Sequence, residues 1–96
     1  MFKISAFYKF AAVKKPLSLQ EKILNKFTKL SIKGTLLLGE EGINGTISAS
    51  NSDNLDNAIN FIKTINGFEN LEVKYSLSEK DPFTRLKVKF KNEIVT

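Results

Sequence analysis

The chain is 96 residues long, with 42% hydrophobic residues, 26% charged residues and a formal net charge of +5. This length suits one domain with a two-layer core and is too short for two independent domains, so we expect residues 1–96 to form a single domain. No segment approaches the roughly 20 apolar residues of a membrane-spanning helix, and residues 1–5 lack the continuous apolar run of a secretory signal. We therefore expect a cytoplasmic chain that does not contact a membrane.

The composition also excludes several kinds of catalytic chemistry. The chain has no cysteine and no histidine, so it lacks a thiol nucleophile, a thiolate metal site and the commonest base at neutral pH. We expect no bound metal and no cofactor. The positive charge comes almost entirely from lysine, because Arg85 is the single arginine. Lysine favours diffuse attraction to polyanions over bidentate recognition.

Residues 2–10 alternate between two faces and predict the first strand. The more apolar face consists of Phe2, Ile4, Ala6, Tyr8 and Phe10. Phe7 and Lys9 lie on the other, more polar face, which we expect to be exposed. After Pro16, apolar residues at helical spacing predict a helix of about 13 residues, and Ser18 and Glu21 have the spacing of a capping box at its start.

The rest of the chain completes an alternation of strands and helices. The patterns predict strands at residues 33–38, 46–49, 71–77 and 85–91, and a helix that opens at residues 50–53 and ends before Gly67. This order is that of a split β-α-β plan in the α+β class. We expect an antiparallel sheet of four to five strands with both helices on one face, since each strand has one apolar side and each helix one apolar stripe. The other face is left to water or to a partner.

Residues 39–46 connect two predicted strands and contain three of the five glycines in the chain. Asn44-Gly45 is a strong signal for a hairpin reversal, so we expect the turn there. Backbone amides of a glycine-rich loop can bind phosphate, but Glu40 and Glu41 would repel an anion, and no further metal ligands are in sight. A structural hairpin is the interpretation we favour.

The last predicted strand offers the strongest candidate for a binding site. A period of two places four basic side chains on one face, namely Arg85, Lys87, Lys89 and Lys91. Such a row could follow a phosphate backbone, and neutralising about four phosphates of a single strand would give a salt slope near −3. The alternative is an edge strand that lysines protect against aggregation. Lys9 would add a further electrostatic contact, and an exposed Phe7 could stack on a base or pack under the chain terminus.

Four segments in order resemble one family. They are residues 6–10, residues 33–46, residues 82–89 and residues 93–96, and the motif within the second is Glu41, Gly42, Ile43, Asn44, Gly45 and Thr46. Over essentially the whole chain they resemble the N-terminal domain of the bacterial rhodanese-containing tRNA uridine hydroxylases. In that family a ferredoxin-like or acylphosphatase-like domain precedes a rhodanese domain with a reactive cysteine. The whole enzyme converts the wobble uridine of certain tRNAs to 5-hydroxyuridine with molecular oxygen.

The resemblance implies a supporting task for this chain, with no catalytic residue of its own. It implies a tRNA-binding or tRNA-positioning module cut from a longer protein, with tRNA and a downstream rhodanese domain as partners. One alternative is a structural module whose glycine-rich hairpin docks on that rhodanese domain. Another is a small acylphosphatase-like hydrolase, but that activity requires a glycine-rich anion loop with an arginine after the first strand. Residues 11–16 contain neither glycine nor arginine.

Overall fold

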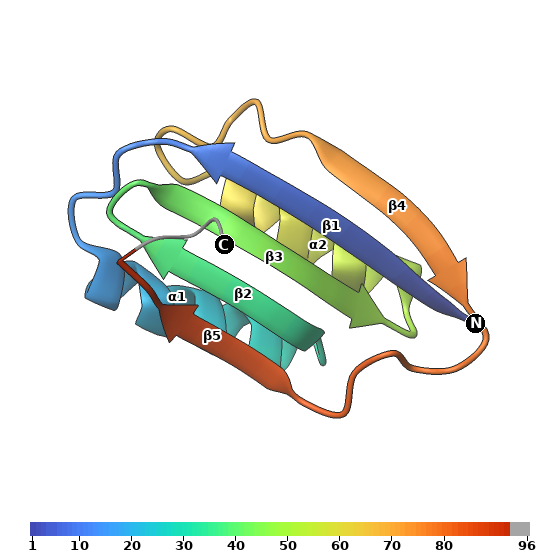
Figure 1. Cartoon of the computed structure of the whole chain (residues 1–96). Coiled ribbons are helices and arrows are strands. Elements are labelled where there is room, and N and C mark those ends of the chain that lie inside the picture. Colours follow the sequence, from blue (N-terminus) through green and yellow to red (C-terminus); the bar gives the residue numbers. More distant parts are fainter. Residues whose placement is uncertain (93–96) are drawn as a thin grey trace.

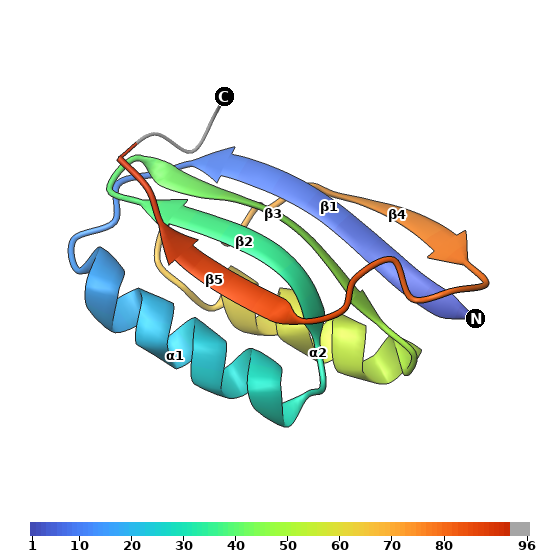
Figure 2. The ribbon, with the colours of Figure 1, turned by 60° about the horizontal axis from the view of Figure 1, so that its bottom comes forward.

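The computed structural model describes residues 1–92. Its elements in chain order are β1 (Phe2–Phe10), α1 (Pro16–Lys29), β2 (Lys33–Gly39), β3 (Gly42–Ala49), α2 (Ser52–Lys63), β4 (Val73–Ser78) and β5 (Leu86–Phe90). The strands form one sheet in the order β4-β1-β3-β2-β5. Neighbouring strands are antiparallel from β4 to β2, and β5 lies parallel to β2 at the edge of the sheet. Both helices lie on the same face (Figures 1 and 2), which confirms the expected split β-α-β arrangement.

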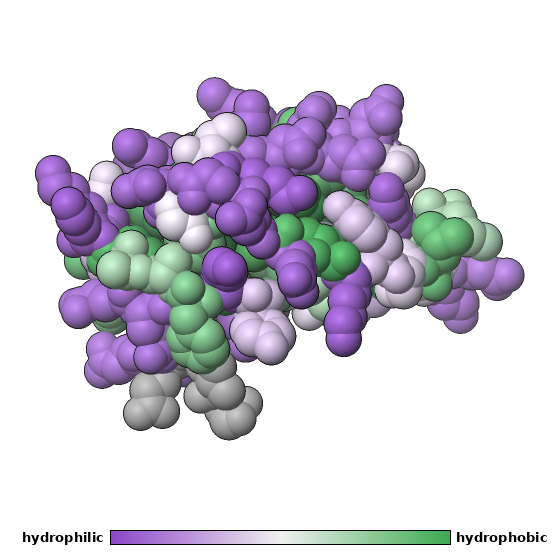
Figure 3. Space-filling model, turned by 90° about the horizontal axis from the view of Figure 1, so that it is seen from above, coloured by the Kyte–Doolittle hydropathy of each residue, from purple (hydrophilic) through white to green (hydrophobic). Residues whose placement is uncertain are grey.

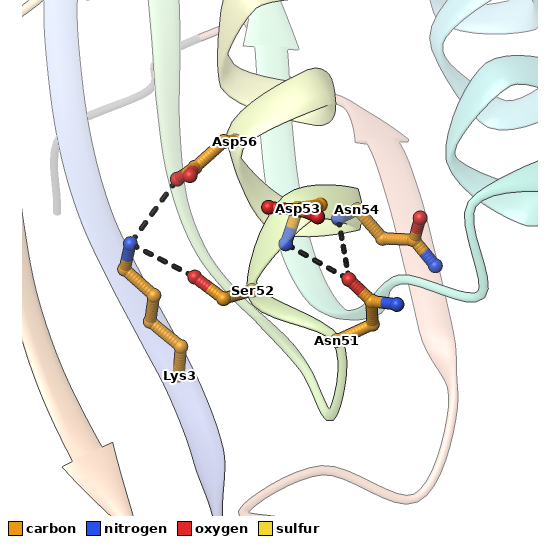
Figure 4. Close-up of polar contacts among 6 residues, drawn as sticks. All are labelled: Lys3, Asn51, Ser52, Asp53, Asn54 and Asp56. Carbon is orange, nitrogen blue, oxygen red and sulfur yellow. Dashed lines mark hydrogen bonds and ion pairs between the residues drawn. The ribbon is translucent and has the colours of Figure 1, made fainter.

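The two helices begin in different ways. Pro16 is the first residue of α1, where its missing N–H costs no hydrogen bond, and no side chain caps this end. The predicted capping box at Ser18 is therefore wrong, because Ser18 lies inside the first turn. In α2 the cap is Asn51, whose side-chain oxygen accepts hydrogen bonds from the backbone N–H groups of Asp53 and Asn54 at 2.9 and 3.2 Å (Figure 4). Neither helix is long and apolar enough to cross a membrane.

The hydrophobic core lies between the sheet and the two helices. α1 packs against β5 and β2, and α2 packs against β1 and β3. The fully buried large side chains of this layer include Ile23, Phe27, Leu36, Leu38, Ile43, Ile47, Leu55 and Ile62. The sheet residues among them alternate along β2 and β3, so the remaining residues of those strands face away from the helices.

The face of β1 that packs against the core is not the face that its sequence pattern predicts. Phe7 is only 4% exposed, whereas Tyr8 is 65% exposed and Phe10 is 55% exposed. Phe7 pairs with Gly45 of β3, and a Cβ at Gly45 would lie 3.1 Å from the Phe7 ring. The missing side chain at Gly45 thus leaves the space that the Phe7 ring fills. The expectation of an exposed Phe7 is wrong.

Lys3, near the start of β1, is one of the polar residues on the buried face of this strand. The Nζ atom of Lys3 lies 3.1 Å from Oδ1 of Asp56 and 3.3 Å from Oγ of Ser52, so Lys3 reaches α2 (Figure 4). The same Nζ atom lies 4.7 Å from the centre of the Tyr75 ring. A long aliphatic stem lets a lysine lie along an apolar face while its charge reaches polar partners. Lys3 therefore does not mark a solvent face.

The reversal between β2 and β3 occurs at Glu40 and Glu41, not at Asn44-Gly45. Asn44 and Gly45 lie within β3, where they pair with Leu37 and Leu36 of β2. The predicted turn position is therefore wrong by about four residues. Because strands on both sides fix their register, these two residues form ladder pairs instead of the turn that they favour in isolation.

The glycine at the start of β3 is required by a close approach to β1. Gly42 has a φ of +150°, and a Cβ there would overlap the carbonyl oxygen of Lys9. The turn itself is bonded to the segment after β1, because the carbonyls of Glu41 and Glu40 accept hydrogen bonds from the N–H groups of Ala11 and Val13, both at 2.9 Å. The motif is thus a structural junction between β1 and the hairpin.

An acidic side chain fixes the connection between β4 and β5. Asp81 accepts hydrogen bonds from the Ser48 hydroxyl at 3.2 Å and the Phe83 N–H at 3.1 Å, and it pairs with the Lys33 ammonium at 3.1 Å. Burial alone would raise the pKa of Asp81, but the hydrogen bonds from Phe83, Lys33 and Ser48 and the charge of Lys33 together lower it. The ionised carboxylate holds the connection that leads into β5.

Candidate nucleic-acid interface

No helix among the described residues covers the sheet face opposite α1 and α2 (Figure 2). The β4–β5 connection meets this face at one end only, where Asp81 is bonded to Ser48 and Lys33. We call this sheet face the open face. The strand registers assign to it Lys74 and Ser76 of β4, Ala6, Tyr8 and Phe10 of β1, Asn44 and Thr46 of β3, Thr35 and Leu37 of β2, and Lys87 and Lys89 of β5. It therefore presents aromatic and small polar groups in the middle, with lysines on both edge strands.

The basic row lies on the open face, as its alternation predicts. Lys87 pairs with Thr35 and Lys89 with Leu37, whereas Val88 between them is buried toward the helices. Backbone hydrogen bonds extend the pairing beyond both ends of β5, because the Arg85 carbonyl accepts from the Gly34 N–H at 3.0 Å and the Lys91 N–H donates to the Leu38 carbonyl at 2.9 Å. The four basic residues thus follow one edge of the sheet.

Two of the six residues that the sequence predicted for nucleic-acid binding face the other way. Phe7 belongs to the hydrophobic core. Lys9 pairs with the fully buried Ile43, so its side chain leaves the sheet on the helix side, where it is half-buried. Lys9 therefore does not extend the basic row, and Phe7 cannot stack on a base without unfolding.

The exposed aromatic pair was not predicted from the sequence. Tyr8 and Phe10 lie two residues apart on the open face, and their rings meet edge to face with centroids 6.3 Å apart and planes at 78°. Their strand has an apolar residue at every position of this face, which is the usual mark of a buried face. The one sequence signal against burial of Tyr8 and Phe10 is Gly45, which leaves space beside Phe7. This signal can be used only when the pairing of β1 with β3 is known.

A depression of about 780 Å³ adjoins the aromatic pair on the open face. Its lining residues include Ala6, Tyr8, Asn44, Thr46, Glu72 and Lys74. Ala6 has the smallest side chain of these six residues, and Gly45, which has no side chain, also lines the depression. Seen from the side of β4, the surface is mostly hydrophilic, and hydrophobic side chains form separate patches (Figure 3).

One row of side chains connects the aromatic pair to the basic row. Tyr8 pairs with Asn44, Asn44 with Leu37, and Leu37 with Lys89. Three strand spacings of about 4.8 Å separate Tyr8 from Lys89, which gives about 14 Å across the sheet. An extended polymer could therefore contact both ends of this row.

The segment between β1 and α1 forms a second, smaller depression of about 340 Å³. It is lined by Lys14, Lys15 and Lys22 together with apolar side chains such as Val13 and Leu19. The described residues contain no group of three or more histidine, cysteine, aspartate or glutamate side chains that could hold a metal ion. This segment has the charge to attract an anion but, with no glycine and no arginine in residues 11–16, lacks the loop expected of an acylphosphatase.

Solved structures share this fold at low sequence identity. The acylphosphatase from Bacillus subtilis is 12% identical, with a TM-score of 0.66, over 92% of this chain and 98% of its own. Full-length HypF in its phosphate- and nucleotide-bound form is 15% identical, with a TM-score of 0.66, over 99% of this chain and 13% of its own. At these identities the likeness shows the fold alone, which is acylphosphatase-like.

Two relatives found by sequence are much more similar to this chain in sequence than these solved structures. A tRNA uridine(34) hydroxylase from Bartonella quintana is 48% identical over 95 residues, and one from Bartonella henselae is 44% identical over 95 residues. Each match covers 99% of this chain but 31% of the relative, so the chain spans about a third of the length of these proteins. The UPF0176 acylphosphatase like domain matches residues 2–94. The resemblance seen in the sequence is thereby confirmed, and the chain belongs to the family of the UPF0176 acylphosphatase like domain.

Proposed function

We propose that this chain is a non-catalytic tRNA-binding module that positions tRNA for a larger, cytoplasmic tRNA uridine hydroxylase. The relatives bear that name and are about three times as long. In this proposal residues 1–96 form one domain, and a downstream rhodanese domain performs the chemistry. The observation that carries the proposal is the placement of the basic row on a sheet face that no helix covers.

The geometry of the row suits a phosphate backbone. Arg85, Lys89 and Lys91 are exposed and Lys87 is half-buried. Lys87 and Lys89 leave the sheet on the open face, and the backbone hydrogen bonds of Arg85 and Lys91 to β2 continue this pairing beyond both ends of β5. Lysine binds phosphate as a point charge without strict geometry, which suits a contact that positions an RNA without reading its sequence. A basic row on an edge strand would also discourage pairing with other chains, so the experiment must separate the two roles.

The docking alternative has less support from the hairpin. Gly42 and Gly45 of the motif pack closely against β1. The carbonyls of Glu41 and of the preceding Glu40 accept hydrogen bonds from the segment after β1. These groups serve the fold of the domain itself. A partner at this end would contact the exposed side chains of the turn instead.

The test is the salt dependence of tRNA binding. Labelled tRNA is titrated with the 96-residue chain between 50 and 200 mM salt, and the affinity is followed by fluorescence anisotropy. Each phosphate contact contributes about 0.7–0.9 to the slope of log K against log salt. The double variant Lys87→Gln/Lys89→Gln should therefore bind more weakly, with a slope smaller in magnitude by about 1.4–1.8.

A matched control removes two exposed lysines from the opposite side of the domain. Lys26→Gln/Lys29→Gln in α1 makes the same change in net charge on the helix layer. This control should keep the slope of the unchanged protein. Equal slopes in both double variants, or no binding at 50 mM salt, would overturn the proposal.

A further inference from the structure

Resting on the proposed function, we infer that Tyr8 and Phe10 form a stacking site for unpaired nucleotides, so that the open face takes single-stranded RNA and not a duplex. This site is separate from the basic row and lies on a central strand. The sequence predicted base stacking for Phe7. Because Phe7 is buried, we assign this role to Tyr8 and Phe10 instead.

The first observation is the exposure of two large aromatic side chains side by side. Tyr8 and Phe10 are 65% and 55% exposed, although burial of such large apolar side chains ordinarily stabilises a fold. Tyr8 lies within β1 and Phe10 is its last residue, and both pair with β3, which restricts their position. Rigid exposed aromatics on a sheet are the platforms on which single-stranded RNA binders stack bases.

The second observation is the space beside the rings. The depression of about 780 Å³ has Ala6 and Thr46 among its lining residues and Tyr8 at its side. A cavity of several hundred Å³ is the size that accepts a small-molecule group such as a nucleoside. Asn44 pairs with Tyr8 across β1 and β3, which places an amide next to the ring, where the edge of a stacked base would lie.

The third observation is charge complementarity around the site. Lys74 borders the depression on β4, and the basic row lies on the opposite edge strand, with Lys89 about 14 Å from Tyr8. Among residues 1–92, Glu72 is the one acidic side chain that lines the depression. Its carboxylate could accept a hydrogen bond from a ribose 2′-hydroxyl, the group by which proteins distinguish RNA from DNA. The surroundings therefore fit a polyanion with exposed bases.

Base pairing decides between the two forms of RNA. A base inside a duplex is stacked on its neighbours and shows only its edge, so it cannot lie flat on Tyr8 or Phe10. An unpaired loop nucleotide can turn its flat side to the ring. The inference therefore predicts a preference for unpaired RNA that the basic row alone would not produce.

Tyrosine fluorescence tests the site directly. The chain has no tryptophan and two tyrosines, Tyr8 and Tyr75, so in the variant Tyr75→Phe the emission comes from Tyr8 alone. Adding a single-stranded RNA decamer at low salt should quench this emission, and the same decamer in a duplex should quench it far less. No quenching at RNA concentrations that saturate binding would overturn the inference.

Affinity measurements supply the second test. Stacking contributes about 1–3 kcal/mol per base, so Tyr8→Ala should weaken binding of the decamer by about 5- to 150-fold. The matched control is Tyr75→Ala, since Tyr75 is 50% exposed but leaves β4 on the helix side. Circular dichroism should show the same fold for both variants, and the more conservative Tyr8→Leu should bind as weakly as Tyr8→Ala.

The outcomes separate this inference from the proposed function. If Tyr8→Ala and Phe10→Ala bind like the unchanged protein while Lys87→Gln/Lys89→Gln binds more weakly, the stacking site is refuted and the tRNA-binding function stands. If no variant and no RNA shows binding, both fail. If Tyr8→Ala instead abolishes a dimer seen by sedimentation without changing RNA affinity, a second copy occupies the face, and the inference is again refuted.

Discussion

The assignment of the two faces of β1 can be tested by comparing Phe7→Ala with Tyr8→Ala. These neighbours have aromatic side chains of similar size but are 4% and 65% exposed. Truncating a buried phenylalanine removes its transfer free energy and leaves a cavity, which together cost about 3–5 kcal/mol. Only about a third of Tyr8 is covered, so its truncation should cost about 0.5–1 kcal/mol, a third of the 1.5–3 kcal/mol for full burial.

Urea unfolding followed by circular dichroism measures both changes in the free energy of unfolding, and thermal unfolding measures the changes in Tm. A domain of this size loses about 4–8 °C in Tm per kcal/mol, so Phe7→Ala should lower Tm by at least 12 °C and Tyr8→Ala by less than 8 °C. The m-value should stay constant if each variant unfolds in one step. If Phe7→Ala does not fold, Phe7→Leu should still be destabilised by about 1–2 kcal/mol. A larger loss for Tyr8→Ala than for either Phe7 variant would refute the assignment.

Three further substitutions test structural features of the fold. Gly42→Ala should lower the free energy of unfolding by more than about 2 kcal/mol, because a Cβ would overlap the carbonyl oxygen of Lys9 at a strained φ; a loss below 0.5 kcal/mol in urea unfolding would contradict the close approach. Asn51→Ala should cost about 1 kcal/mol through loss of the α2 cap, and thermal unfolding with Asn51→Ser as a capped control checks it. Because the folded pKa of Asp81 is lowered from 3.8, its ionised form stabilises the fold above that pH, and this contribution is lost as pH falls through the lowered value. Asp81→Asn should therefore flatten the pH dependence of stability below pH 4, and an unchanged profile would contradict the role given to its contact with Lys33.

The fold was largely predictable because its signals are local and repeated. Strands and helices of the right number and order follow from apolar periods of two and of about 3.6 residues, and the basic row of β5 kept its predicted face because Val88 alternates with charged neighbours without ambiguity. The features predicted wrongly had competing signals. Asn44-Gly45 favours a turn in isolation, but the pairing of β3 with both neighbours outweighs that preference.

The sequence by itself determined the order of the elements, the α+β class, the family and a basic strand with one charged face. Each of these depends on the pattern within one segment or on similarity along the chain. Only the tertiary structure decided which face of β1 is buried, because both of its faces carry apolar residues and the choice depends on what lies opposite. Phe7 lies beside Gly45, which has no side chain, and this contact between distant segments leaves Tyr8 and Phe10 on the same open face as Lys89.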